Sequence, residues 1–110
     1  MPAIRVLEYI DASGRSPYGR WFDRLKAVAA AKVATGVYRL SEGNFSNVKG
    51  VGGGVFEFRI DFGPGYRVYF GKDGDLVVIL LGGSSKKDQQ QAIAAATKEW
   101  SAYKQAKRSR

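Results

Sequence analysis

The sequence contains no cysteine and no histidine in 110 residues. Without cysteine there is neither a disulfide nor a thiolate-bound metal, a composition compatible with a reducing cytosol, and we expect a cytoplasmic protein. Without histidine there is no imidazole general base, no histidine-bound metal and no Ser-His-Asp triad. Any nuclease chemistry in this chain therefore has to use lysine, arginine and tyrosine.

Acidic residues are also scarce, and they are scattered rather than clustered as in a two-metal nuclease, so we expect no metal and no cofactor. The glycine-rich segment 50–54 precedes a predicted strand rather than a helix, which argues against a nucleotide-binding loop. The longest apolar run, residues 76–81, is far shorter than a membrane span, and no signal peptide is visible. We therefore expect no association with a membrane.

Positive charge is what the sequence has in excess. Lysine and arginine number 18 against 10 aspartates and glutamates, for a formal net charge of +8. A field of this sign favours RNA, DNA, ribosomes or acidic proteins as partners, although charge that only maintains solubility is the alternative. With 45% hydrophobic residues, the chain is expected to fold as one domain over residues 1–110.

The first half of the chain predicts one strand followed by a helical hairpin. Residues 3–10 alternate loosely, as in a strand. Ser16 and Pro17 are typical of the first positions of a helix. A second helix is expected over residues 27–40. The apolar positions at helical spacing are Tyr18, Trp21 or Phe22, Leu25 and Val28 in the first segment, and Val33, Val37 and Leu40 in the second.

The second half predicts an antiparallel meander and a final helix, so the fold class is α+β. Strands are expected over residues 55–61, 66–71 and 76–81, separated by glycine-containing turns. The last strand is apolar throughout, as expected for a strand covered on both faces. A helix should run from Lys86 or Lys87 to about Tyr103 and dock through Ile93, Ala96, Trp100 and Tyr103, leaving 104–110 as a frayed basic tail.

Alternation in the first two of these strands predicts one polar sheet face. Glu57, Arg59, Arg67 and Tyr69 should share it, because successive side chains of a strand point to opposite sides. Two guanidiniums on one face can hold a phosphate, and a nearby phenol can stack on a base. The alternative is that Arg59 and Arg67 only pair with Glu57 and Asp61 in a solvated ladder of charges.

Four segments carry a resemblance to a known family. They are FSNVKGVG at 45–52, VFEFRID at 55–61, GPGYRVYF at 63–70 and LLGGSSKKDQ at 80–89. The chain resembles the HigB-like addiction-module killer proteins of the RelE/ParE superfamily over nearly its whole length. The resemblance implies a RelE-like fold with an N-terminal strand, a two-helix hairpin, a three-stranded antiparallel meander completing a twisted sheet, and a C-terminal helix.

The same resemblance implies a function. Such proteins are toxins of type II toxin-antitoxin systems, and the expected activity is ribosome-dependent, metal-independent mRNA cleavage that inhibits translation and arrests growth. The polar sheet face would receive mRNA, and a ribose 2′-hydroxyl would attack the adjacent phosphate. The implied partners are the ribosome, mRNA and a cognate antitoxin of helix-turn-helix type, with promoter DNA reached only through the antitoxin.

Individual roles follow from the matching motif positions. Arg67 matches an arginine that stabilises the transition state in RelE-type toxins. Lys86 and Lys87 follow the last strand, where either could orient phosphate or protonate the leaving oxygen, although solvated lysines opening a helix would look the same. Tyr69 is the candidate general base and a further RNA contact.

Lys49 and Arg59 complete the set as expected RNA contacts. The final helix departs from the family pattern, since Asp88 stands at a usually basic position and Ala92 at an often acidic one. The tyrosine that some RelE-like toxins carry near the start of this helix has no match, because residues 89–91 are all glutamine.

Two other functions remain open from the sequence. The first is a ParE-like poison of DNA gyrase without nuclease activity, in which Arg59 and Arg67 would be structural. The second is a non-toxic module that binds nucleic acid or antitoxin and contributes only to repression of its own promoter.

Overall fold

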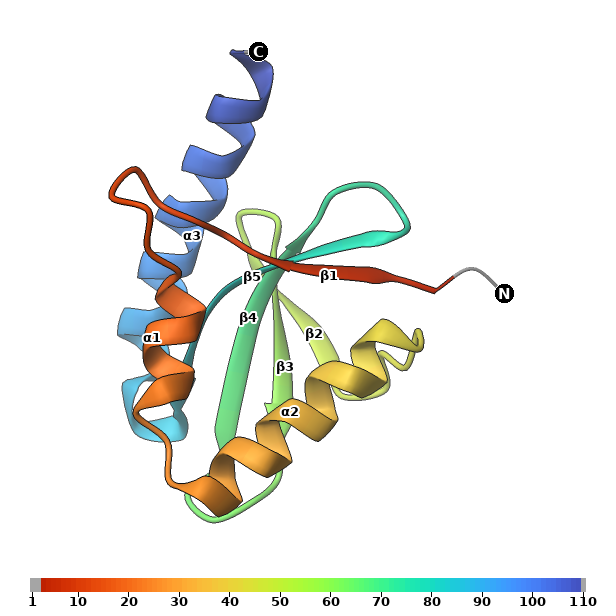
Figure 1. The fold of residues 1–110 in the computed structure, drawn as a ribbon, viewed down its shortest axis with the longest axis vertical. Coiled ribbons are helices and arrows are strands. Elements are labelled where there is room, and N and C mark those ends of the chain that lie inside the picture. The colour runs from red at the N-terminus through yellow and green to blue at the C-terminus, as the bar shows by residue number, and fades with distance from the viewer. Residues whose placement is uncertain (1–2, 110) are drawn as a thin grey trace.

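The computed structural model describes residues 3–109 and has an α+β fold with a five-stranded mixed sheet (Figure 1). The elements, in chain order, are β1 (Arg5–Glu8), α1 (Pro17–Asp23), α2 (Ala27–Ser41), β2 (Val48–Gly52), β3 (Val55–Ile60), β4 (Tyr66–Lys72), β5 (Val77–Ser85), a 3-10 turn (Lys86–Asp88) and α3 (Gln89–Arg108).

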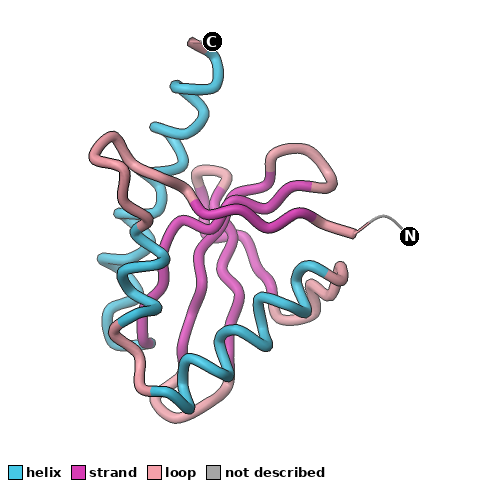
Figure 2. Tube along the Cα trace, viewed as in Figure 1, coloured by secondary structure: helices cyan, strands magenta, loops and turns pink. Residues whose placement is uncertain are grey.

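The strand order across the sheet is β1-β5-β4-β3-β2 (Figure 2). Strand β1 is parallel to β5, and the other neighbours are antiparallel. The prediction of a three-stranded meander missed one strand, because the antiparallel meander has four strands, β2 to β5. Its sequence, VKGVG, contains two glycines, a residue type depleted in strands, and its pairing with β3 shifts register between Gly50 and Gly52.

Strand β5 is longer than its apolar run, since it continues through the segment 82–85 that we interpreted as a loop. Gly82 and Gly83 pair with Tyr69 and Val68 of β4. A Cβ atom at Gly83 would lie 2.3 Å from the ring of Trp21. Glycine is therefore needed here for the close approach of an aromatic ring rather than for a turn.

Two consecutive helices, α1 and α2, stand where the helical hairpin was expected. Ser16 is the N-cap of α1 and accepts a hydrogen bond from the Gly19 amide, with Pro17 at the first helical position. The prediction that Val28 belongs to the buried stripe of the first helix was wrong. It lies in α2 and is 62% exposed, because the chain leaves the axis of α1 before residue 27.

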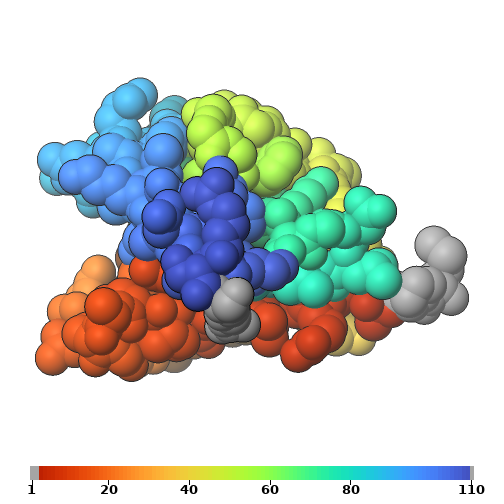
Figure 3. All heavy atoms as spheres, turned by 90° about the horizontal axis from the view of Figure 1, so that it is seen from above, coloured from red at the N-terminus to blue at the C-terminus, as the bar shows by residue number. Residues whose placement is uncertain are grey.

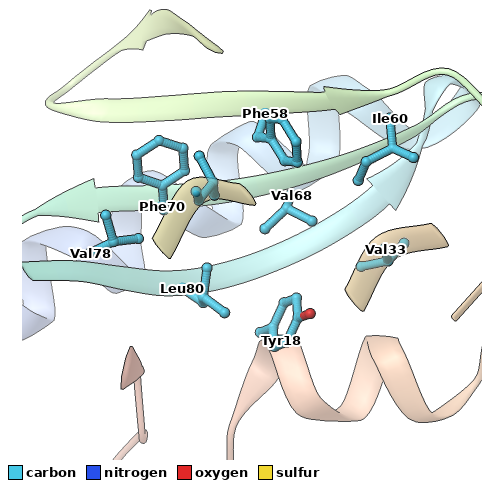
Figure 4. Packing of buried hydrophobic residues seen from close by; sticks show 9 residues of the cluster. Tyr18, Val33, Phe58, Ile60, Val68, Phe70, Val78 and Leu80 are labelled. Atoms are coloured by element: carbon cyan, nitrogen blue, oxygen red, sulfur yellow. The ribbon is translucent and has the colours of Figure 1, made fainter. Parts of the chain in front are cut away.

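Two hydrophobic clusters lie on opposite faces of the sheet. The first, between the sheet and helices α1 and α2, contains Tyr18, Val33, Leu40, Phe58, Ile60, Val68, Phe70, Val78 and Leu80 (Figure 4). The second, under α3, contains Val55, Tyr69, Ile79, Leu81, Ala96 and Trp100. Alternate residues of β5 enter the two clusters, which confirms that its apolar run is covered on both faces.

Helix α3 docks through the expected stripe but extends to Arg108. The expected frayed tail from 104 is thus helical through 108, and residue 110 lies outside the described residues. Tyr103 and Lys107 both bond the carboxylate of Asp73, in the turn between β4 and β5, which holds this end of the helix. Within residues 3–109, no helix is both long and apolar enough to cross a membrane.

Glu99 of α3 is a half-buried carboxylate near Asp11. Burial, and then the charge of Asp11, raise the pKa of Glu99 from 4.5 to about 7. Because the folded pKa lies above the unfolded one, this group's contribution to stability is lost as the pH rises from about 4.5 to about 7. We expect Glu99→Gln to flatten that decline.

Above pH 7, Glu99→Gln should raise the free energy of unfolding by about 1 kcal/mol relative to the wild type, after discounting for the solvent that reaches a half-buried group. Urea unfolding at pH 4.5 and pH 8 measures it, with the exposed Glu42→Gln as the matched control. An equal pH dependence of wild type and Glu99→Gln would contradict this prediction.

Candidate nucleic-acid interface

The strands bring the predicted polar residues onto one sheet face. In the antiparallel pair of β3 and β4, Glu57 is opposite Tyr69 and Arg59 is opposite Arg67. The register confirms the face assignment made from alternation. Two arginines directly across a strand pair repel each other, so this arrangement requires nearby negative charge.

Glu57 supplies that charge from within the protein, and it is buried with only 2% of its side chain exposed. Its Oε1 lies 3.5 Å from Nε of Arg67 and 3.8 Å from Nζ of Lys49, and its Oε2 accepts a hydrogen bond of 2.7 Å from Nε2 of Gln89. We call Glu57, Arg67, Tyr69, Ser84 and Gln89 the buried polar cluster. It ties three strands to the first turn of α3.

Arg67 is the incompletely satisfied member of the cluster. Its side chain is 10% exposed, and its Nε and Nη1 are buried without a hydrogen-bond partner among the described residues. The contact between Nε of Arg67 and Oε1 of Glu57 is thus an ion pair that does not form a hydrogen bond. A Cβ on Gly65 would lie 3.7 Å from Nη1 of Arg67 and 4.0 Å from Cβ of Lys86, so these two cations flank the same turn.

Tyr69 is placed differently from what its predicted roles require. It is fully buried, and its hydroxyl lies 3.1 Å from Oγ of Ser84. Burial raises the pKa of Tyr69, with the Ser84 hydrogen bond opposing the rise and the charge of Glu57 adding to it. A buried phenol that holds its proton at neutral pH cannot stack on a base and is poorly suited to act as a general base.

Helix α3 explains this burial. Its residues Ala96 and Trp100 pack with Tyr69, and Gln89 bonds Glu57, so the face that we expected to be open is covered at these positions. Arg59 and Arg67 do pair with Asp61 and Glu57, as in the ladder of charges that the sequence left open as an alternative. However, its Arg67–Glu57 pair is buried, whereas the Arg59–Asp61 pair, 3.4 Å long, is solvated.

The other predicted cations surround the buried polar cluster at the surface. Lys49 and Arg59 are 68% and 53% exposed at the side chain and line a shallow groove of about 170 Å³ across β2 and β3. Lys86 and Lys87 are exposed in the 3-10 turn that follows β5. The structure thus places Arg67 and the backbone of Lys86 at the same turn, around Gly65, and Arg59 opposite Arg67, while Tyr69 is inaccessible.

Sequence reasoning missed Ser84 and Gln89. Ser84 pairs with Arg67 in the register of β4 and β5, and it was overlooked because its segment was assigned to a loop. Gln89 was noted only as the residue type present where a tyrosine was expected. A long-range contact between residues 32 positions apart in the chain leaves no local sequence signal.

The site offers charged donors rather than metal ligands. Glu57 is committed to Arg67, Lys49 and Gln89, and Asp61 pairs with Arg59. Across residues 3–109 no three aspartate, glutamate, histidine or cysteine side chains gather as they would around a metal ion. The arginine and lysine side chains of the site can bind anions and stabilise negative charge.

Comparison with known proteins adds one relative. An uncharacterized protein of Haemophilus influenzae is 44% identical to this chain over 63 residues, which are 56% of the chain. The matched part spans 64% of the length of that protein, less than two thirds. No protein-family model matches the chain.

Proposed function

We propose that the protein is a toxin of a type II toxin-antitoxin system that cleaves mRNA on the ribosome. The observation that carries the proposal is the guanidinium of Arg67, whose Nε and Nη1 are buried without hydrogen-bond partners among residues 3–109. Buried donors without hydrogen-bond partners cost about 1–3 kcal/mol each and are rare in native proteins, which supports a role for this guanidinium in binding an anion. A phosphate would contact the guanidinium at the 10% of the side chain that is exposed and would bring a second negative charge to it.

Each cation then has a defined part in the reaction. Arg67 stabilises the negative charge that builds on phosphorus as the ribose 2′-hydroxyl attacks. Lys86, beside the same turn, binds a phosphate oxygen or donates a proton to the leaving oxygen. Arg59 and Lys49 hold the RNA backbone on the two neighbouring strands. An acidic surface of the antitoxin would neutralise the same cations.

Tyr69 has no part in this proposal, and the group that accepts the proton of the 2′-hydroxyl is not assigned to the chain. The ribosome surrounds the message in such a reaction, so part of the active site need not come from this protein.

Replacing both exposed lysines tests the proposal without disturbing the core. We expect Lys86→Ala/Lys87→Ala to lower ribosome-dependent mRNA cleavage by at least about tenfold, because the variant loses a phosphate contact or a general acid. The stability should be unchanged, since both side chains are exposed. Cleavage of a translated message by purified protein and ribosomes measures the effect.

The matched control is Lys26→Ala/Lys98→Ala, which removes the same charge from two exposed lysines outside the site, one immediately before α2 and one on α3. Equal rates for the two double variants would show that only net charge matters, and would remove Lys86 and Lys87 from the mechanism.

One observation favours a second candidate, a gyrase poison of the ParE kind. Arg67 is ion-paired with Glu57 and largely buried, and Arg59 pairs with Asp61, as expected if both arginines were structural. A supercoiling assay with purified gyrase distinguishes the two functions. Inhibited supercoiling together with intact mRNA would support the gyrase candidate over the nuclease.

A further inference from the structure

A groove of about 500 Å³ adjoins the buried polar cluster through Ser84 and lies between α1, the end of β5 and the beginning of α3. Figure 3 shows a notch between α1 (orange) and the start of α3 (light blue). The groove is lined by Trp21, Arg24, Leu25, Tyr66, Gly83, Ser84, Ser85, Asp88, Gln91 and Ala92. Its volume is within the range of small-molecule sites.

Two aromatic rings form one wall of this groove. Trp21 and Tyr66 are only partly buried and meet edge to face, with centroids 6.4 Å apart at 60°. Trp21 is held in place because its ring rests on the backbone of Gly83, where a Cβ would lie 2.3 Å away. The tryptophan is thus a preformed flat surface rather than a flexible one.

Polar groups lie around the aromatic wall. Arg24, on the α1 side, is exposed and has no acidic partner among the described residues, while Asp88 and Gln91 line the α3 side. Together they offer a cation, a hydrogen-bond acceptor and an amide that both donates and accepts. A phosphate and the edge of a heterocyclic base need this combination.

Among residues 3–109, the end of β5 has no strand beside it on the β1 side. Strand β1 pairs only with residues Val77 to Leu80, so the part of β5 at Gly83 and Ser85 has no strand neighbour on that side. An extended peptide could not use this edge, because α1 packs across it through Trp21.

We propose that this groove is a nucleobase-binding subsite, in which a base of single-stranded RNA stacks on Trp21 while Arg24 contacts its phosphate. The inference rests on the proposed function, since it assigns a second contact for the same RNA. The link between the sites is short, because Ser84 lines the groove and also contacts Tyr69 of the buried polar cluster. The subsite would position one nucleotide near the cleaved phosphate.

Tryptophan fluorescence of the intact protein tests the subsite. The chain has two tryptophans, and Trp100 is only 5% exposed, so a ligand in the groove should quench Trp21 selectively. We expect saturable quenching by guanosine 5′-monophosphate and none by ribose 5-phosphate at the same concentrations. Trp21→Phe should abolish the signal, and Arg24→Ala should weaken binding about tenfold.

Gly83→Ala provides a second variant, because it keeps Trp21 but displaces its ring, and it should weaken binding of the nucleotide. Equal quenching by ribose 5-phosphate, or unchanged binding in Gly83→Ala and Arg24→Ala, would overturn the subsite. Quenching by an acidic peptide but not by the nucleotide would overturn it in favour of a protein partner. The mRNA cleavage assay is independent of the fluorescence measurement. If the protein cleaves mRNA but the nucleotide does not quench Trp21, only the subsite is rejected. If the nucleotide quenches Trp21 but mRNA stays intact, only the nuclease function is rejected.

Discussion

Arg67→Met is expected to lower ribosome-dependent mRNA cleavage by at least about 100-fold, the loss typical of removing one group that stabilises transition-state charge. Methionine keeps much of the length and apolar contact of the side chain while it removes the guanidinium. The cleavage rate of a translated message under single-turnover conditions measures the effect. Arg67→Lys should retain the positive charge but lose the forked donors. Its cleavage rate should therefore lie between those of the wild type and Arg67→Met.

The ion pair with Glu57 complicates the single variant, because an uncompensated buried carboxylate destabilises a protein by about 3–5 kcal/mol. Glu57→Gln/Arg67→Met removes both charges and should restore much of the stability. If Arg67 acts in the reaction, the double variant folds but does not cleave.

Glu57→Gln alone completes the cycle of variants. This variant keeps the guanidinium and should still cleave mRNA. If the ion pair were purely structural, Glu57→Gln, Arg67→Met and the double variant would differ only in stability. Full cleavage by the folded double variant would remove Arg67 from the mechanism.

Trp100→Ala is expected to lower the free energy of unfolding by about 4 kcal/mol, the usual cost of truncating a buried tryptophan. Its ring is 5% exposed, stacks on Tyr103 at 5.2 Å and lies against Gly71, where a Cβ would be 2.4 Å away. Since domains of this size are stable by only about 5–15 kcal/mol, the variant should be marginal at 37 °C. Urea unfolding monitored by circular dichroism measures the loss.

The exposed Val28→Ala is the matched control and should change stability by less than about 0.5 kcal/mol. Because α3 covers the buried polar cluster through Trp100, Trp100→Ala should also increase the rate of hydrogen exchange at the backbone amides of Glu57 and Tyr69. A loss below about 1 kcal/mol would contradict the placement of α3 as the cover of this sheet face.

Local patterns were sufficient for much of this fold. Alternation placed Glu57, Arg59, Arg67 and Tyr69 on one face because the period of a strand is independent of what covers it. Ser16 and Pro17 marked the start of α1 because capping chemistry is local. The helical spacing of Ala96 and Trp100 indicated the docked face of α3 for the same reason.

The errors concern contacts between distant segments. No pattern near Tyr69 shows that α3 buries it, and no pattern near Gln89 shows its bond to Glu57. Gly82 and Gly83 read as a loop because the reason for glycine at position 83, the ring of Trp21, lies some 60 residues away in the chain. Strand β2 was missed because it is glycine-rich, and its pairing with β3 makes it a strand.

We propose that this protein cuts mRNA on the ribosome through the cations around Arg67. The most direct measurement maps mRNA 5′ ends in cells after induction of the wild type, comparing a message with its start codon intact and the same message with that codon removed. New 5′ ends inside the translated message, absent from the untranslated one and absent with Glu57→Gln/Arg67→Met, are the expected result. Growth arrest by the wild type with both messages intact would contradict the account.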